Sequence, residues 1–376
     1  MKIVFYTDQM YLHGGIEKML SNKLNYFSKL ENYEIHLITF EQKDNPYCYF
    51  VPENIIIHDL NINYNRDISY FKFKNLRKVP KHIINLKKLL NKISPDILIV
   101  ANYSFDFYFI PLIKDKVKII KEYHSSRYKN TIIKLSLKRK IFNKLIEKVN
   151  SWYDYIIVLN DDEKQLYSTN NVEVIPNCIK IDTDTKDHQT REKRIISAGR
   201  IAPVKQFDHI IKAWEEIAIK YPNWFVEIYG DGDEELLKKY NKYISDKNIK
   251  NIRFMSSTIE LDKIMQSSSI FLLSSETECF PMVLLESLKN GLPIISYKSP
   301  YGPQNIITDG KDGILSNYND IEKLAQSLDL LINDKNKLIS MREDAIKNIN
   351  RFSEEIIMQK WIKLFRNSID KNKSKI

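Results

Sequence analysis

The sequence predicts an α/β fold built from two mostly parallel sheets, each covered by helices on both faces. Short apolar runs that are typical of strands alternate with longer segments of helical periodicity along most of the chain. A polar and charged stretch over 177–194 has few apolar anchors and interrupts this alternation, which then restarts. The 376 residues are enough for two domains with substantial cores.

The composition is that of an ordinary globular chain. With 43% hydrophobic and 28% charged residues, the chain is neither disordered nor fibrous. No apolar run approaches the ~18 residues that span a bilayer, and the N-terminus reaches Asp8 too early for a secretory signal. We therefore expect a cytoplasmic protein. The cysteines lack metal-ligand spacing, so we expect reduced thiols at Cys48, Cys178 and Cys279.

The first half of the chain opens with a strand, a glycine turn and a helix. Strand-like runs lie at 2–7, 35–40, 55–60, 97–101, 117–123, 155–159 and 172–176. Gly14 and Gly15 allow a backbone to approach a phosphate or sugar closely, although paired glycines also make any tight turn. His124 follows the fifth run, at the strand end where ligands of parallel sheets bind. A lone histidine there is also commonly structural.

Positive charge is concentrated between Arg66 and Lys148. This segment holds 21 Lys and Arg against 6 Asp and Glu, a balance of +15 compared with +10 for the whole chain. Two parts of it, 71–93 and 131–149, interleave lysines with apolar residues at helical spacing, which suits an anionic membrane surface. A solvated lysine-rich face is the alternative, and we favour the membrane. Zinc spacing and aromatic RNA-binding motifs are absent from the sequence, so we expect no nucleic-acid partner.

The second half restarts the alternation with strands at 194–199, 225–230, 252–255 and 270–273 and helices at 207–221, 233–248 and 259–267. Arg200 and Lys205 follow the first of these strands. A guanidinium fork and an ammonium point charge on one loop are apt partners for a diphosphate. The alternative is that both are generic surface charges.

The stretch over 274–296 predicts a loop, a helix and a strand. Pro281 suits the first turn of a helix, and Gly291 suits its left-handed end. Glu278 and Glu286 then flank the helix N-terminus, which favours phosphate, while carboxylates accept hydrogen bonds from hydroxyl groups. This arrangement fits a nucleotide-sugar, with Glu278 on the sugar, the helix end on the diphosphate and Glu286 on the ribose. Two surface glutamates around an ordinary buried helix would look the same.

The Glu-x7-Glu spacing, in its Phe-Pro-Met-Val-Leu-Leu-Glu context, resembles the donor-binding motif of retaining GT-B glycosyltransferases of family 4. The Gly-Gly-x-Glu-Lys string resembles the first loop of that family, apart from Lys18 in place of arginine. Gly199 and Arg200, with Lys205 five residues later, resemble its diphosphate clamp. The resemblance is strong over 195–332 and scattered over 1–180.

The resemblance implies the GT-B fold, with two Rossmann-like domains that face a central cleft. It assigns 1–185 to an acceptor-binding domain, 186–350 to a nucleotide-sugar donor domain, and 351–376 to a C-terminal helix that packs back on the first domain. It also implies the site residues. These are, for catalysis, His124, Arg200, Lys205 and Glu278, and, for donor binding, Gly14, Gly15, Gly199, Gly230, Phe280, Pro281, Met282, Val283 and Glu286.

The implied activity is that of a retaining, metal-independent hexosyltransferase without a cofactor. It would move a sugar from a nucleotide-sugar, with UDP as the expected nucleotide, to a lipid-linked or surface-polysaccharide acceptor of capsule or lipopolysaccharide synthesis. The site of action would be the inner face of the bacterial plasma membrane. Asp182-Thr183-Asp184 is an Asp-x-Asp string of the kind that holds a divalent ion in another glycosyltransferase fold. Here we assign it to the linker. The alternatives are a nucleotide-sugar epimerase or hydrolase on the same scaffold, and a non-catalytic basic binding protein.

Overall fold

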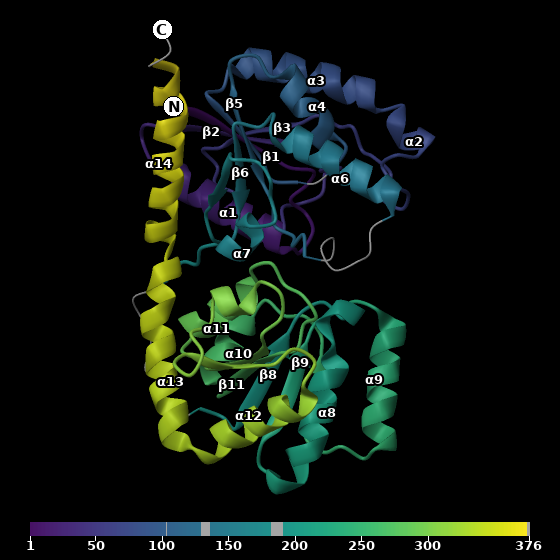
Figure 1. Cartoon of the computed structure of the whole chain (residues 1–376), viewed down its shortest axis with the longest axis vertical. Helices are drawn as coiled ribbons and strands as arrows, with labels where there is room; N and C mark the ends of the chain where they lie inside the picture. Colours follow the sequence, from purple (N-terminus) through teal and green to yellow (C-terminus); the bar gives the residue numbers. More distant parts are fainter. Residues whose placement is uncertain (103, 129–135, 182–190, 374–376) are drawn as a thin grey trace. The chain divides into compact units, whose positions relative to one another are not determined.

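The computed structural model describes residues 1–102, 104–128, 136–181 and 191–373, which form two compact units (Figure 1). Unit 1 comprises Met1–Asn177 together with Ile357–Ile376, and unit 2 comprises Cys178–Ile356. The domain boundary predicted near residue 185, and the Asp182-Thr183-Asp184 string, lie outside the described residues.

Unit 1, within the described residues, contains a seven-stranded parallel sheet in the order β3-β2-β1-β4-β5-β6-β7. Its elements before the linker are β1 (Lys2–Tyr6), α1 (Gly15–Phe27), β2 (Glu34–Thr39), β3 (Ile56–Asp59), α2 (Phe73–Leu76), α3 (Val79–Ile93), β4 (Ile97–Val100), α4 (Asp106–Ile113), β5 (Lys118–Glu122), α6 (Leu137–Asn150), β6 (Tyr155–Val158), α7 (Asp161–Lys164) and β7 (Val172–Val174). The central strand β4 is a short run of Ile, Leu and Val that is buried throughout, as expected for a parallel sheet covered by helices.

Unit 2, within the described residues, contains a six-stranded parallel sheet in the order β10-β9-β8-β11-β12-β13. Its elements are β8 (Arg194–Ala198), η1 (Pro203–Lys205), α8 (Phe207–Ile217), η2 (Ala218–Lys220), β9 (Phe225–Tyr229), α9 (Glu234–Asp246), β10 (Ile252–Met255), α10 (Leu261–Ser267), β11 (Ile270–Leu273), α11 (Met282–Lys289), β12 (Ile294–Tyr297), η3 (Pro303–Asn305), β13 (Gly313–Ser316), α12 (Ile321–Asn333), α13 (Lys335–Asn348) and η4 (Ile349–Phe352). The last helix, α14 (Glu354–Lys373), has only its first residues in unit 2. The predicted helix over 207–221 is thus an α-helix that tightens into a 3-10 turn after Ile217.

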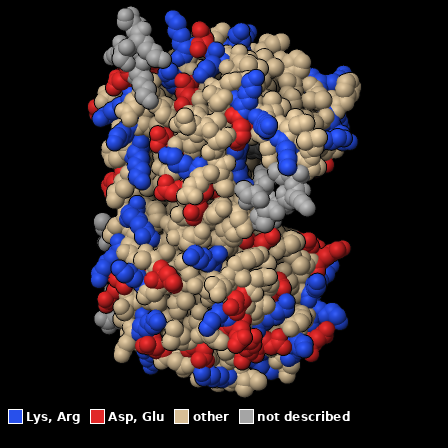
Figure 2. Space-filling model, viewed as in Figure 1, with Lys and Arg blue, Asp and Glu red and all other residues tan. Residues whose placement is uncertain are grey.

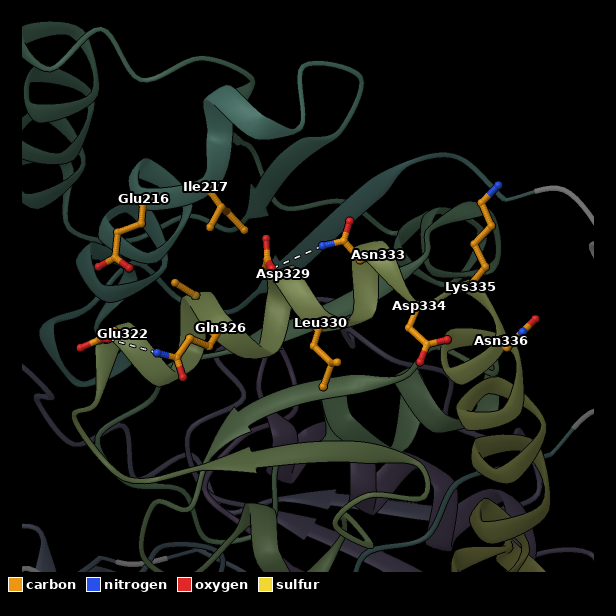
Figure 3. A pocket seen from close by; sticks show the side chains of 11 residues that line it. Glu216, Ile217, Glu322, Gln326, Asp329, Leu330, Asn333, Asp334, Lys335 and Asn336 are labelled. Atoms are coloured by element: carbon orange, nitrogen blue, oxygen red, sulfur yellow. Dashed lines mark hydrogen bonds between the residues drawn. The ribbon is translucent and has the colours of Figure 1, made fainter.

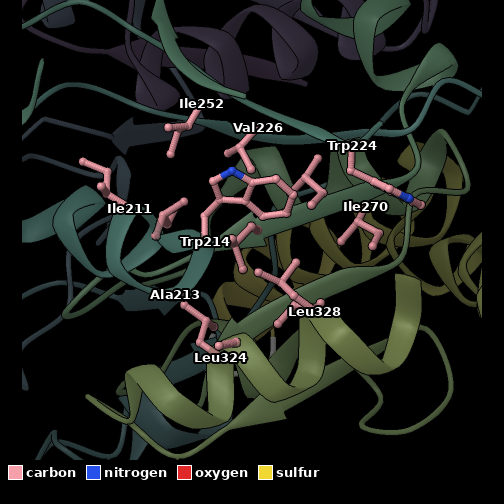
Figure 4. Close-up of a cluster of buried hydrophobic side chains, with 14 of the residues drawn as sticks. Ile211, Ala213, Trp214, Trp224, Val226, Ile252, Ile270, Leu324 and Leu328 are labelled. Atoms are coloured by element: carbon pink, nitrogen blue, oxygen red, sulfur yellow. The ribbon is translucent and has the colours of Figure 1, made fainter. Parts of the chain in front are cut away.

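The core of unit 2 is centred on Trp214, whose side chain is fully buried. Figure 4 shows its indole surrounded by apolar side chains that include Val226 of β9, Ile252 of β10 and Leu328 of α12. The indole N–H donates a 2.9 Å hydrogen bond to the backbone carbonyl of Lys250, so the one polar atom of the ring is satisfied. Truncation of such a residue to alanine costs about 3–5 kcal/mol.

Helix α14 begins in unit 2 and belongs to unit 1 from Ile357 onward, which confirms the predicted return of the C-terminal helix. The ring of Phe365 packs against that of Phe27 in α1, with the centroids 5.4 Å apart. Both phenylalanines are fully buried. In the part of the chain that the structure describes, no helix has the length and apolar character needed to cross a membrane.

Candidate active site

The C-terminal ends of β8 and β11 carry two loops that are bonded to each other. These strands are neighbours in the sheet of unit 2. The Ser274 hydroxyl donates to the backbone carbonyls of Lys205 and Gln206, at 2.8 and 2.9 Å. The backbone N–H of Glu276 donates to the carbonyl of Val204, also at 2.8 Å. Loop 199–206 and loop 274–280 therefore form one rigid edge, at the place where parallel sheets bind ligands.

Lys205 and Glu278 meet at this edge, 73 residues apart in the sequence. The lysine Nζ lies 2.6 Å from Oε1 of the glutamate, and both side chains retain some contact with solvent. The pair thus places a positive and a negative charge side by side at this edge, and neither side chain is completely removed from water.

The backbone of Glu278 is fixed as well. It exchanges two 3.3 Å hydrogen bonds with the loop before η3, one to the carbonyl of Pro300 and one from the N–H of Tyr301. A Cβ at Gly302 would lie 2.7 Å from the Cβ of Glu278, so only glycine permits this approach. The carboxylate is thus anchored from its backbone as well as by Lys205.

Gly199 and Gly230, which directly follow β8 and β9, allow the backbones of these two strand ends to approach each other in a similar way. A Cβ at Gly230 would lie 1.9 Å from the backbone oxygen of Gly199, a distance that no carbon and oxygen can adopt without a bond. The N–H of Gly199 also donates to the carbonyl of Tyr229 at 3.0 Å. The two glycines therefore bring the strand ends together beside Lys205, whose Cε lies 3.3 Å from the position of a Cβ on Gly199.

Helix α11 begins at Met282, one residue after the start predicted near Pro281, which occupies the N-cap position instead. No side chain caps this end, and the first turn contains no acidic residue. Phe280 is buried just before the helix, with its ring 5.4 Å from that of Phe352. Glu286 lies in the second turn and is half-buried. An uncapped helix N-terminus next to a lysine has the electrostatic character of an anion site.

Arg200 is exposed in loop 199–206, and among the described residues no hydrogen bond or ion pair engages its guanidinium. Its charge is therefore available to a ligand at the same edge as Lys205 and α11. Within the described segments no group of three or more His, Cys, Asp or Glu side chains is arranged to bind a metal ion.

In unit 1, the predicted residues Gly14 and Gly15 lie at the start of α1. A Cβ at Gly14 would lie 2.1 Å from Oε2 of Glu17, whereas a Cβ at Gly15 would meet nothing within 4 Å. Gln9 donates a hydrogen bond to the carboxylate of Glu17, and burial raises the pKa of that carboxyl group. Gly14 therefore leaves room for a buried carboxylate that stabilises the loop before α1, a local role that the sequence pattern does not reveal.

His124 follows the end of β5, with Tyr123 between them. Its Nε2 is 3.2 Å from Oε2 of Glu122, and the same carboxylate oxygen lies 2.5 Å from Nζ of Lys23 in α1. Sequence reasoning missed both Lys23 and Glu122. Lys23 is 99 residues from Glu122, and nothing in the local sequence of α1 marks this lysine as one with a buried partner.

A surface cavity of about 920 Å³ lies elsewhere on unit 2, between the end of α8 and helices α12 and α13 (Figure 3). None of the predicted site residues lines it. The carboxylates of Glu216, Glu322, Asp329 and Asp334 do, with Lys335 as the one cation among its lining residues. Burial and the neighbouring Glu322 and Glu215 raise the pKa of Glu216. Because a diphosphate would be repelled by this lining, we do not assign the donor to this cavity.

Comparison with known proteins adds independent findings. The model of "Glycosyltransferase Family 4" matches residues 13–183, and that of "Glycosyl transferases group 1" matches residues 180–351. An uncharacterized glycosyltransferase of Haemophilus influenzae is 27% identical over 96% of this chain and 98% of its own length. The poly(ribitol-phosphate) alpha-N-acetylglucosaminyltransferase of Staphylococcus aureus is 26% identical over 92% of this chain and 72% of its own.

The fold is shared with a solved structure. A crystal structure of a variant of S. aureus TarM, in complex with fondaparinux, alpha-GlcNAc-glycerol and UDP, superposes with a TM-score of 0.76. The match covers 97% of this chain and 99% of that one, at 17% identity. At this level of identity the likeness establishes the GT-B architecture.

Proposed function

The chain belongs to glycosyltransferase family 4, the glycosyl transferases group 1, and from this premise we propose that it moves a sugar from a UDP-sugar to a surface-polysaccharide or lipid-linked acceptor. That it is a nucleotide-sugar-dependent glycosyltransferase of the retaining type follows from the family. The nucleotide, the acceptor, the roles of single residues and the membrane location are our proposals.

The observation that carries the proposal is the Lys205–Glu278 pair beside the uncapped N-terminus of α11. A diphosphate carries more negative charge than one carboxylate, so it competes for Lys205 and releases Glu278. Glu278 is then free to accept hydrogen bonds from the hydroxyl groups of the transferred sugar. We assign the ribose to Glu286. The UDP in the S. aureus TarM complex supports the choice of nucleotide.

The reaction needs positive charge where the β-phosphate departs. Arg200, Lys205 and the backbone N–H groups at Met282 and Val283 supply it, and a well-placed group of this kind can contribute ~3–4 kcal/mol to the transition state. The departing phosphate takes the proton of the acceptor hydroxyl on the same face of the sugar, which retains the anomeric configuration. Glu278 orients the sugar in this scheme and forms no covalent intermediate.

The acceptor side of the proposal rests on the surface of unit 1. Figure 2 shows Lys and Arg side chains over the part of unit 1 that holds α2, α3 and α6. In α6 the apolar side chains of Leu137 and Ile141 are 74% and 61% exposed between lysines. Such a surface fits the inner, anionic face of the plasma membrane, where lipid-linked acceptors are presented. The first part of the predicted segment 131–149 lies outside the described residues.

The test is thermal unfolding of the purified protein against UDP-, GDP- and ADP-sugars, followed by transfer assays with the nucleotide that binds. We expect UDP-sugars at 100 times their Kd to add about 2.7 kcal/mol to the stability of the protein. Arg200→Ala and Glu286→Ala should reduce this gain. Arg253→Ala is the matched control, since Arg253 lies on β10 and pairs with Glu227 away from the site.

Two results would contradict the proposal. A UDP response that persists in full in both Arg200→Ala and Glu286→Ala would remove the assigned site. Turnover of the donor at an undiminished rate without any glycan acceptor would instead favour a hydrolase or an epimerase. Retention itself is read from the anomeric configuration of the product by NMR.

A further inference from the structure

A second surface cavity, of about 620 Å³, lies on unit 1 at the N-terminal ends of three neighbouring strands, β5, β6 and β7. Lys118 begins β5, Tyr155 begins β6, and loop 168–171 leads into β7. All of the lining residues belong to unit 1. Ligands of parallel sheets usually bind at the opposite strand ends, and none of the predicted site residues lines this cavity.

Every residue that lines the cavity has a polar side chain. Sites for drug-like ligands are lined mainly by apolar and aromatic side chains, with a few polar groups among them. The cavity has a volume within the ~300–1,000 Å³ that is typical of ligand sites, but its lining does not fit an apolar ligand. It indicates a ligand that forms hydrogen bonds.

Several oxygen atoms at the cavity are acceptors without a donor among the described residues. The Ser151 hydroxyl donates to the backbone carbonyl of Lys148 at 2.7 Å. The Ser168 hydroxyl donates to the carboxylate of Glu147 at 2.9 Å. Both serine oxygens therefore keep lone pairs that can accept. The carboxylate of Glu173 is exposed and forms no hydrogen bond or ion pair within the described residues. This arrangement favours a ligand that supplies donors.

Two further oxygens of the lining are buried and unpartnered. The Nδ2 of Asn171 donates to the backbone carbonyls of Asn150 and Tyr153, at 3.0 and 2.8 Å, which fixes the orientation of the amide. Its Oδ1 and the Oγ1 of Thr169 have no hydrogen-bond partner in the part of the chain that the structure describes. Buried polar atoms without partners destabilise a free protein. A ligand that donates to them removes this penalty and gains affinity.

The charges at the cavity are balanced. The two carboxylate oxygens of Asp154 lie 3.3 Å from Nζ of Lys118 and 2.9 Å from Nζ of Lys114. With Glu173 included, these four side chains have no net charge. A phosphate group therefore finds no excess of positive charge, and an ammonium or guanidinium group finds no excess of negative charge. The donors that fit are uncharged.

Uncharged donors are hydroxyl or amide groups. A peptide segment offers one N–H group per residue, whereas a sugar ring carries several hydroxyl groups side by side. A hydroxyl group can also accept a hydrogen bond, as the side-chain amide of Asn170 in the lining requires. The chemistry of the cavity thus matches a sugar better than a peptide.

We propose that this cavity is a binding site for a neutral glycan, distinct from the reaction site. Hydroxyl groups of the glycan donate to the unpartnered oxygens of Thr169 and Asn171 and to the carboxylate of Glu173. Binding itself needs no nucleotide and no residue of unit 2. Its use rests on the proposed function, because a long glycan acceptor that is held here as well as at the reaction site binds more tightly than a short one.

The test is calorimetric titration of the purified protein with neutral tetrasaccharides of glucose, of galactose and of N-acetylglucosamine. We expect at least one of them to bind without nucleotide, with a Kd that UDP leaves unchanged. Glu173→Ala should weaken binding tenfold or more, because a hydrogen bond to a charged acceptor is lost, and Thr169→Val should weaken it about fivefold. Thr169→Val should not lower the unfolding temperature, since the hydroxyl that it removes has no partner in the free protein.

Glu53→Ala is the matched control for Glu173→Ala. Glu53 is also an exposed glutamate of unit 1, but it precedes β3, the strand at the other edge of the sheet. Its loss should leave the Kd of the tetrasaccharide unchanged. The inference is wrong if no tetrasaccharide binds, or if Glu173→Ala and Thr169→Val bind as tightly as this control. A Kd that changes with UDP would place the glycan at the reaction site instead.

Transfer assays separate this inference from the proposed function. Glu173→Ala should raise the KM of a long glycan acceptor and leave kcat, and the KM of a monosaccharide acceptor, unchanged. An unchanged KM for the long acceptor would overturn the use of the cavity in transfer. A protein that binds the tetrasaccharide through Glu173 but transfers no sugar from any donor would contradict the proposed function alone.

Discussion

At the scale of single residues, the edge of unit 2 formed by loops 199–206 and 274–280 is held together by its own contacts. Glu278 is anchored by two backbone hydrogen bonds and by the close approach of Gly302, and its carboxylate meets Lys205. Groups that are already in place cost little reorganisation when charge develops, which is the basis of electrostatic catalysis. Glycine matters at this edge because strands and loops approach more closely than a Cβ allows.

Gly230→Ala tests this packing. The added Cβ would lie 1.9 Å from the backbone oxygen of Gly199, so the loop beside Lys205 must move. We expect a loss of about 1–3 kcal/mol of stability and at least a tenfold weaker affinity for UDP, measured by thermal unfolding and by calorimetric titration.

Gly15→Ala is the control for stability. A Cβ there meets nothing within 4 Å, at a helical position where alanine is favoured over glycine. It should leave the free energy of unfolding unchanged or raise it by up to about 1 kcal/mol. Native UDP affinity in Gly230→Ala would show that the loop has room that the structure does not indicate.

At the scale of elements, α6 differs from the other long helices of unit 1. Only Val149 and Asn150, at its last turn, are buried, and Ser136 caps its start by accepting a hydrogen bond from the N–H of Arg139. Ile146 also packs against the core of unit 1. The apolar side chains of Leu137 and Ile141 are exposed instead. Glu147 ties it to Arg127 of the loop that follows His124.

A double substitution, Leu137→Ser with Ile141→Ser, should weaken binding to vesicles that contain anionic lipid. Both side chains are exposed, so their loss removes apolar area from the membrane contact and costs little stability. We expect a decrease of tenfold or more in the partition coefficient, measured by vesicle co-sedimentation.

Ile219→Ser provides the matched control, because Ile219 is an isoleucine of unit 2 that is even more exposed than Leu137 and Ile141. Its effect on vesicle binding should be negligible. Equal binding of the double variant and the native protein would favour the alternative that the lysine-rich helices are only solvated.

At the scale of the whole molecule, the two units have separate cores, and α14 connects the chain end to the first of them. Units with independent cores can unfold in separate steps. A ligand that binds one unit should then raise the unfolding temperature of that unit alone.

Phe365→Ala exploits this separation. Phe365 is fully buried against Phe27, so its truncation should destabilise unit 1 by about 3–5 kcal/mol. UDP at 100 times its Kd should instead raise the free energy of unfolding of unit 2, by about 2.7 kcal/mol. Differential scanning calorimetry resolves the two effects. A single transition that shifts with both changes would show that the units unfold together.

The sequence alone determined the features that depend on neighbouring residues. The alternation of strands and helices, the start of α11 within one residue of Pro281 and the left-handed end at Gly291, with φ of 58°, all follow from local preferences. The motif at 278–286 and the clamp residues identified the family. The roles of the individual site residues stay predictions.

Only the tertiary structure decided which distant side chains meet. The Lys205–Glu278 contact spans 73 residues and the Lys23–Glu122 contact spans 99, and Trp361 reaches Lys23 from the other end of the chain. Such contacts depend on strand order and on the return of α14, which periodicity does not encode. The local pattern indicates which face of its own helix or strand a residue lies on. A buried charge, however, is stable only with partners that the fold brings to it from distant parts of the chain.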